Sequence, residues 1–233
     1  MQSNQTKLFP AMKAAFPHTI PVFAGYCFLG MSYGFLMKSS GFPFWYPILT
    51  SLVIFAGSME FMTVNLLLGA FDLLQAFALT LMINARHLFY GLSMLGKYQK
   101  MGTKKPYLIF GLTDETFSVN CATQPPEGID RGWFYFFITL LDHAYWVLGA
   151  TLGGIFGSLI TFNTEGLDFV MTSLFVVILL EHLLTTKDKR SAATGMVLSL
   201  AMLLLFEADG FMLPAMVSIL IVLTLEAKKE VAK

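Results

Sequence analysis

Charged residues are scarce in this sequence. Asp, Glu, Lys and Arg make up 13% of its 233 residues, whereas a soluble globular domain carries roughly 25%. Hydrophobic residues make up 56%, which leaves no room for a sizeable water-soluble domain and excludes an ordinary soluble enzyme. The formal net charge is zero, so the chain lacks the basic surface that would bind nucleic acid.

Cysteine and histidine are also sparse. Cys27 and Cys121 are the only cysteines, and two buried free thiols are favoured over a disulfide. The four histidines are scattered singly, so no metal cluster is expected. The sequence contains no Gly-x-Ser-x-Gly, His-Glu-x-x-His or Walker pattern. We therefore expect neither an enzyme nor a bound cofactor or metal.

Long apolar segments dominate what is present. A spanning helix needs about 20 apolar residues, and these segments lack the period of two that is typical of transmembrane strands. The sequence predicts one all-α transmembrane domain over residues 1–233, a polytopic helical bundle of seven or eight spans with discontinuous helices. The segments are 14–37, 44–70, 74–96, 106–122, 133–160, 168–184, 192–207 and 211–227.

Basic loops suggest the topology. The positive-inside rule places 185–191 and the C-terminus in the cytoplasm. Three spans from a cytoplasmic N-terminus would leave the lysines of 97–105 outside. The short, polar segment 106–122 either crosses or is re-entrant, and the re-entrant alternative keeps those lysines inside but moves the N-terminus outside. We favour eight spans.

Two short motifs hint at a duplication. Gly41-Phe42-Pro43-Phe44 and Gly166-Leu167-Asp168-Phe169 each follow a glycine-rich segment. Transporters often duplicate a helical bundle, and the corresponding repeats would cover about 14–122 and 133–227.

A helix break is predicted in the second segment. Gly57 and Ser58 lie near its middle, where a break would expose backbone amides that favour a carboxylate. Glu60 follows at once, deep in the segment. The alternative is a glycine tolerated by packing and a glutamate hydrogen-bonded to a neighbouring helix.

Arg86 is the least expected residue in an apolar stretch, since an arginine at the centre of a bilayer costs about 2.5–3.5 kcal/mol. Its planar guanidinium matches a carboxylate. Asn84 and His87 share a helix face, while Arg86 points elsewhere, toward Tyr90. Histidine changes charge near neutral pH. The alternative is a structural ion pair between Arg86 and Asp114 or Glu115.

Asp114 and Glu115 form a polar centre in segment 106–122. Adjacent carboxylates at one site do not both ionise easily, which suits proton coupling or the binding of an ammonium group. The alternative is a helix start, with Thr113 as its cap.

Segment 133–160 carries two further features. Asp142 and His143 are interpreted as interhelical contacts rather than a proton relay. Gly149, Gly153 and Gly157 lie on one helix face and favour close helix packing.

Five motifs follow one another along the chain. They are Phe55-Ala56-Gly57-Ser58-x-x-Phe61, Asn84-Ala85-Arg86-His87-x-x-Tyr90-Gly91, Leu112-Thr113-Asp114-Glu115-x-Phe117, Trp146-Val147-Leu148-Gly149 and Gly166-Leu167-Asp168-Phe169. Together they resemble the AzlC family, the large subunits of branched-chain amino acid exporters. The resemblance covers nearly the whole chain in order.

The resemblance implies export of small apolar amino acids across the plasma membrane of a prokaryote, which is the inner membrane if the cell is Gram-negative. It also implies a smaller membrane subunit of the AzlD type as partner, besides the lipid bilayer and the amino acid itself. The family motif usually has Gln at the position of Glu60, so an acid here would bind a proton or an ammonium group directly.

A branched-chain amino acid needs a carboxylate site, an ammonium site and an apolar pocket. Arg86, with Asn84, or the break at Gly57-Ser58 would supply the first. Asp114, Glu115 or Glu60 would supply the second, and His87, Asp114 and Glu115 are candidates for proton coupling. The pocket would be lined by Phe55, Phe61, Phe89 and Phe117.

The competing interpretation is a membrane scaffold subunit of another complex that transports nothing. The buried arginine and acids argue against a scaffold, because it need not bear their insertion cost.

Overall fold

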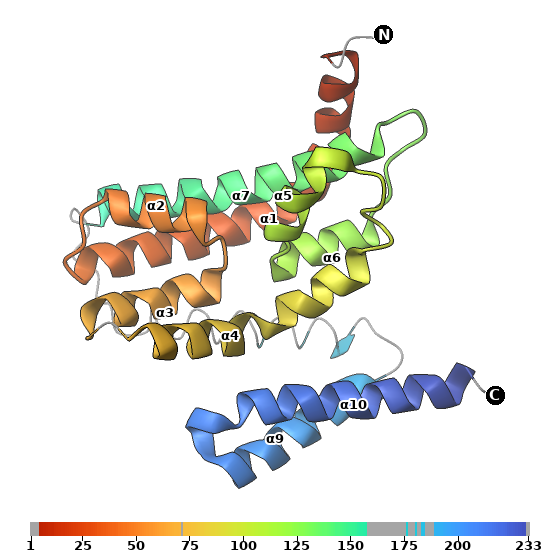
Figure 1. Ribbon diagram of the computed structural model, residues 1–233. Helices are drawn as coiled ribbons and strands as arrows, with labels where there is room; N and C mark the ends of the chain where they lie inside the picture. The colour runs from red at the N-terminus through yellow and green to blue at the C-terminus, as the bar shows by residue number, and fades with distance from the viewer. Residues whose placement is uncertain are drawn as a thin grey trace. The chain divides into compact units, whose positions relative to one another are not determined.

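The computed structural model describes residues 5–70, 72–157 and 189–231, together with positions 176, 180, 183 and 184. Every regular element in these residues is helical (Figure 1), as predicted. Most of segment 168–184, the motif at 166–169 and the end of segment 133–160 lie outside the described residues. The elements are α1 (Gln5–Ser39), α2 (Trp45–Val53), α3 (Gly57–Leu68), α4 (Leu73–Met94), the 3-10 helix η1 (Gly102–Lys104), α5 (Lys105–Phe110), α6 (Asp114–Ala122), α7 (Arg131–Phe156), α9 (Arg190–Gly210) and α10 (Met212–Val231).

The chain divides into two compact units, Met1–Met171 and Thr172–Lys233. The first holds every predicted site residue. In the second, α10 follows α9 after Phe211 and packs against it.

Helices α1 and α7 run parallel and in close contact (Figure 1). A Cβ atom on Gly34 would overlap the Ala150 carbonyl, and one on Gly153 would overlap the Met31 carbonyl. The predicted packing role of the glycine face on α7 is therefore confirmed. Lys7–Ser39 and Arg131–Phe156 are the two helices of the described chain that are long and apolar enough to cross a membrane.

Segment 44–70 forms a helical hairpin instead of the single apolar span that was expected. Tyr33 on α1 contacts both arms, through a 2.7 Å hydrogen bond to Thr50 on α2 and through ring contact with Phe61 on α3. Phe55, in the turn between the arms, contacts Tyr26, which lies two turns earlier on α1. The predicted helix break is present, because α3 begins at Gly57, but the chain reverses there. We call α2 and α3 the first hairpin.

Segment 106–122 also doubles back. Tyr107 on α5 packs on Phe136, and the carbonyl of Thr123, just after α6, accepts a hydrogen bond from Tyr135. Between these arms, Thr116 reaches Asp142, two turns further along α7. We call α5 and α6 the second hairpin.

The two hairpins approach from opposite ends of α7. The first begins beside Gly154, whose added Cβ would meet Phe44 and Pro47. The second begins beside Trp133, whose ring lies 4.1 Å from Lys104 Nζ. Their tips meet near the middle of the unit, where the rings of Phe55 and Phe110 lie 6.3 Å apart.

Helix α4 passes along both hairpins. Thr80 contacts Met59 on α3, and the Lys97 ammonium just beyond α4 donates to the carbonyls of Asn120, Cys121 and Thr123 at the end of α6. Such a lysine stabilises a helix C-terminus. The opposite face of α4 carries a stripe of exposed apolar side chains, as expected for contact with lipid. These are Leu74, Phe77, Leu81, Leu88 and Leu92.

Both cysteines are free, as predicted. The expected burial is wrong for Cys121, which is exposed near the end of α6, and Cys27 is half-buried. The apolar sequence around Cys121 suggested burial, but this side chain lies on the exposed face of the last turn of α6.

Candidate functional site

The tip of the first hairpin is built around Glu60. Phe55 has a backbone φ of 44°, which residues other than glycine rarely adopt. Glu60 Oε1 accepts hydrogen bonds from the Ala56 N–H at 3.2 Å and from the Trp146 indole at 2.8 Å. Its side chain is fully buried, and Oε2 has no hydrogen-bond partner in the described part of the chain. The hydrogen-bonded glutamate foreseen as the alternative is therefore present.

Arg86 connects the two hairpin tips. Its Nη2 atom lies 3.0 Å from Asp114 Oδ2 and donates to Ser58 Oγ at 3.0 Å. Tyr90 donates to the other Asp114 oxygen at 2.6 Å. Ser58 lies in the first turn of α3 and Asp114 opens α6, so one guanidinium joins the N-terminal ends of two helices. Helix N-termini favour negative charge, and the arginine adds a full positive charge at the same place.

The expected alternative pairing of Arg86 is thus confirmed for Asp114. Both side chains of the pair are half-buried, with 28% and 20% of their surfaces exposed. The expected capping role of Thr113 is confirmed too, because its side chain accepts the Thr116 N–H at the start of α6. An N-cap threonine and an N-terminal acid both stabilise the start of a helix.

Asn84 and His87 lie one helical turn apart on α4, next to Arg86. Asn84 Oδ1 is buried, and the described residues offer it no hydrogen-bond partner. The His87 ring contacts Tyr90, with 5.6 Å between centroids. Asn84 thus presents a buried, unused acceptor on α4, two residues before Arg86.

The aromatic residues that were predicted to line one apolar pocket do not all lie together. Phe117 stacks on Tyr90 at 4.3 Å and so adjoins the Arg86–Asp114 pair. Phe55 stacks on His143 at 4.1 Å and Phe61 packs on Tyr33, which directs both toward α1 and α7. Among the predicted aromatic residues described here, Phe117 lies beside the ion pair through its stack on Tyr90.

Residues of α1 and α7 complete the polar interior. Tyr26 donates to Glu115 Oε2 at 2.8 Å, and Thr116 donates to Asp142 Oδ2 at 2.9 Å. His143 bonds Tyr107 and the Ser51 carbonyl, one from each hairpin. Asp142 and His143 therefore make the interhelical contacts that the sequence predicted. Sequence reasoning missed Tyr26 and Thr116, because a hydroxyl in an apolar helix gives no distinct signal.

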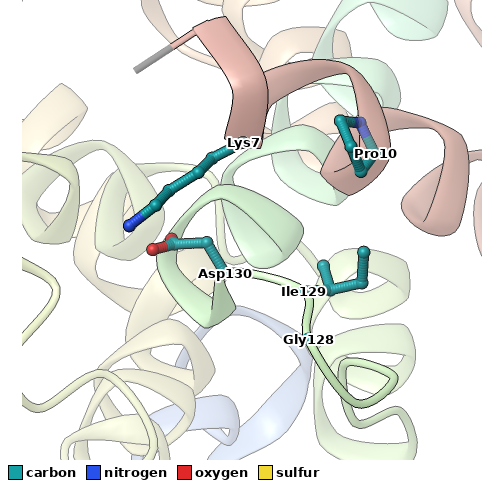
Figure 2. Close-up of a pocket in the computed structure, with 5 residues that line it drawn as sticks. All are labelled: Lys7, Pro10, Gly128, Ile129 and Asp130. Atoms are coloured by element: carbon teal, nitrogen blue, oxygen red, sulfur yellow. The ribbon is translucent and has the colours of Figure 1, made fainter. Parts of the chain in front are cut away.

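A separate pocket lies where the N-terminal part of α1 meets the start of α7. Figure 2 shows its lining, and its volume is about 190 Å³. None of the predicted site residues lines it. The lining residues are Lys7, Pro10, Gly128, Ile129 and Asp130.

Two opposed helical hairpins with a half-buried arginine–carboxylate pair at their tips define an all-helical membrane protein with a polar site between its helices. The sequence profile of the AzlC family, described as AzlC protein, matches residues 21–160. The chain belongs to this family, as its motifs indicated.

Three relatives illustrate the similarity. The chain is 56% identical over 226 residues to the "Branched-chain amino acid transport protein AzlC" of Bacillus subtilis, covering 97% of this chain and 89% of that protein. It is 43% identical over 231 residues to an "Uncharacterized membrane protein" of Haemophilus influenzae, covering 98% and 95%. It is 28% identical over 172 residues to the "Inner membrane protein YgaZ" of Escherichia coli, covering 70% and 69%. These relatives are bacterial membrane proteins and place the chain in a prokaryotic membrane. No solved structure matches.

Proposed function

We propose that this chain is the large subunit of a two-component secondary transporter that exports branched-chain or similar small apolar amino acids. The observation that carries the proposal is the Arg86–Asp114 pair at the meeting point of two helix N-termini. The name of the Bacillus subtilis relative supports the same class of substrate.

The pair matches a zwitterion. An amino acid brings one carboxylate and one ammonium group, so it can replace each partner of Arg86 and Asp114 without changing the net charge of the site. In the proposed complex the substrate carboxylate binds to Arg86 and to the N–H groups at Gly57 and Ser58. The ammonium takes Asp114 or Glu115. Broken helices whose N-termini face a substrate carboxylate are a recurring design in transporters.

Neighbouring groups complete the proposed site. The unused Asn84 acceptor is available to the substrate, and Phe117 supplies an apolar surface beside the ion pair. Glu60 contributes by holding the tip of the first hairpin. His87, Asp114 and Glu115 remain candidates for proton coupling.

The hairpins also give a simpler topology than sequence alone. If α1, α4 and α7 cross and both hairpins are re-entrant, two crossings separate the N-terminus from the lysines at 97–105. Both then lie in the cytoplasm and satisfy the positive-inside rule. The chain is proposed to be multi-pass in the plasma membrane, with a small AzlD-type subunit beside it.

Counterflow in proteoliposomes tests the function. Vesicles loaded with unlabelled leucine should take up labelled leucine, isoleucine, valine or methionine when they contain this chain and its small partner. Analogues that lack either the carboxylate or the ammonium should compete poorly, because each leaves one member of the pair unsatisfied. Absence of exchange for every neutral amino acid, with and without the small subunit, would contradict the proposal and favour a scaffold.

A further inference from the structure

A continuous chain of hydrogen-bonded hydroxyl groups joins Glu115 to Asp142. The Tyr26 hydroxyl lies 2.8 Å from Glu115 Oε2 and 2.6 Å from Thr113 Oγ1. Thr113 Oγ1 lies 3.0 Å from Thr116 Oγ1, which lies 2.9 Å from Asp142 Oδ2. The chain crosses from the tip of the second hairpin, by way of α1, to the middle of α7.

The number of hydrogens in this chain is informative. Four oxygen–oxygen contacts need four hydrogens, and each hydroxyl supplies one. Thr116 donates to Asp142 and Thr113 donates to Thr116, so the single Tyr26 hydrogen is left for two contacts. The missing hydrogen has to come from a carboxyl group. The full set of contacts therefore requires one proton on the Glu115–Asp142 pair.

That proton has two alternative positions, and either one completes all four hydrogen bonds. When Glu115 holds it, each group donates toward Asp142, which is ionised. When Asp142 holds it, every hydrogen bond runs the other way and Glu115 is ionised. Conversion breaks the O–H bond of one carboxyl, passes one hydrogen along at each hydroxyl and forms the O–H bond of the other carboxyl. No atom is gained or lost.

The two ends lie in different surroundings. Glu115 is half-buried at the hairpin tip and adjoins the charges of Asp114 and Arg86. Asp142 is fully buried, and its Oδ1 has no hydrogen-bond partner in the described residues. Besides Glu115 and Tyr26, the Tyr107 side chain interacts with it electrostatically. Tyr26 is held in place by ring contacts with Phe55 and Trp146.

We propose that Tyr26, Thr113 and Thr116 form a proton wire between Glu115 and Asp142, which carries the coupling proton from the hairpin tip to α7. The proposal rests on the proposed function, since it supplies the proton path of that transporter. In this proposal Glu115 and Asp142 hold the proton at the two ends, and the hydroxyl groups of Tyr26, Thr113 and Thr116 relay it.

Thr116→Val is the sharpest test. Valine keeps the shape of threonine and removes the hydroxyl, while the Thr116 N–H that caps α6 on Thr113 is unchanged. Thr139→Val is the matched control, because Thr139 is an equally buried threonine on α7 outside the wire. Reconstituted protein is assayed for leucine uptake driven by an imposed pH gradient and for leucine counterflow at equal pH.

The wire predicts that Thr116→Val lowers the ratio of gradient-driven uptake to counterflow about tenfold or more. Thr116→Ser should restore the ratio, and Thr139→Val should match the wild type. An unchanged ratio, or an equal fall in both rates, would overturn the wire. Loss of counterflow in the wild-type protein would instead contradict the proposed function.

Infrared difference spectroscopy tests the shared proton without transport. An amide at either end supplies the fourth hydrogen, so Glu115→Gln and Asp142→Asn should each remove the same protonated-carboxyl band. A band that is lost in only one variant, or in neither, would overturn the shared proton.

Discussion

Trp146 on α7 donates its indole N–H to Glu60 on α3 across 2.8 Å and so anchors the tip of the first hairpin. The same indole ring closes over the start of α3, where a Cβ on Gly57 would meet it at 3.0 Å. Trp146 therefore explains both Gly57 and Glu60 in the first turn of α3.

Glu60→Gln should preserve this anchor. An amide oxygen accepts from Trp146 and Ala56 as the carboxyl oxygen does, so membrane abundance should equal that of the wild type. We expect a shifted pH optimum or substrate ranking, measured with neutral and cationic substrates at several pH values. Glu60→Leu, which loses both hydrogen bonds, should reduce abundance. Identical transport profiles for Gln and wild type would show that Glu60 is only an anchor.

Arg86→Lys should keep the protein in the membrane but lower leucine transport about tenfold or more. Loss of one hydrogen bond to a charged group costs about 1.5–3 kcal/mol, and about 1.4 kcal/mol corresponds to tenfold. Lysine keeps the charge but loses the planar guanidinium, whose Nη2 atom contacts both Ser58 and Asp114. The control is Arg131→Lys, whose guanidinium bonds the Lys97 carbonyl near the surface. Normal transport by Arg86→Lys would exclude a bidentate role, and failure to accumulate would make Arg86 purely structural.

Asp114→Asn should uncouple transport from the pH gradient. The amide retains an acceptor for Tyr90 or Arg86 but removes the charge that the ion pair needs. Uptake with and without an imposed gradient measures the effect. Asp130→Asn is the matched control, because Asp130 caps α7 and asparagine caps equally well. Persistent gradient dependence in Asp114→Asn would remove Asp114 from the proton path.

The re-entrant first hairpin predicts that Ser39 and Gln99 lie on opposite sides of the membrane. Both side chains are exposed, and single cysteines there, with Cys27 and Cys121 replaced by serine, can be labelled with an impermeant maleimide. Ser39→Cys should react from the periplasmic or outer side and Gln99→Cys only from the cytoplasm. Labelling from the same side would favour segment 44–70 as a true span.

Gly153→Ala should destabilise the pair of α1 and α7 by about 1–3 kcal/mol, as overpacking of a tight contact does. Its Cβ has no space beside the Met31 carbonyl. Gly25→Ala is the control on the same helix pair, since nothing lies within 4 Å of its added Cβ. Thermal unfolding of the purified protein in detergent compares them. Equal transition temperatures would contradict the close packing.

Sequence alone predicted the break before Gly57 and offered, as alternatives, the cap at Thr113 and a partner for Arg86 in Asp114 or Glu115. The break and the cap depend on local chemistry. The sequence did not show that the chain reverses at Phe55, because the apolar pattern of a hairpin and of a span is the same. The link from Tyr26 to Thr113 was also beyond reach, since it joins residues 87 positions apart in the sequence. The repeats over 14–122 and 133–227 remain a prediction. The seven or eight spans expected from the sequence are also untested, and two re-entrant hairpins, as proposed above, would leave fewer.

The contact between Phe55 and Phe110 has a mechanical consequence. In the proposed topology the hairpins enter the membrane from opposite sides, so the contact between their tips is the barrier between the two sides of the site. Movement of one hairpin tip away from the other would therefore change the side of the membrane from which a solute enters. Helices α1 and α7 would not need to move.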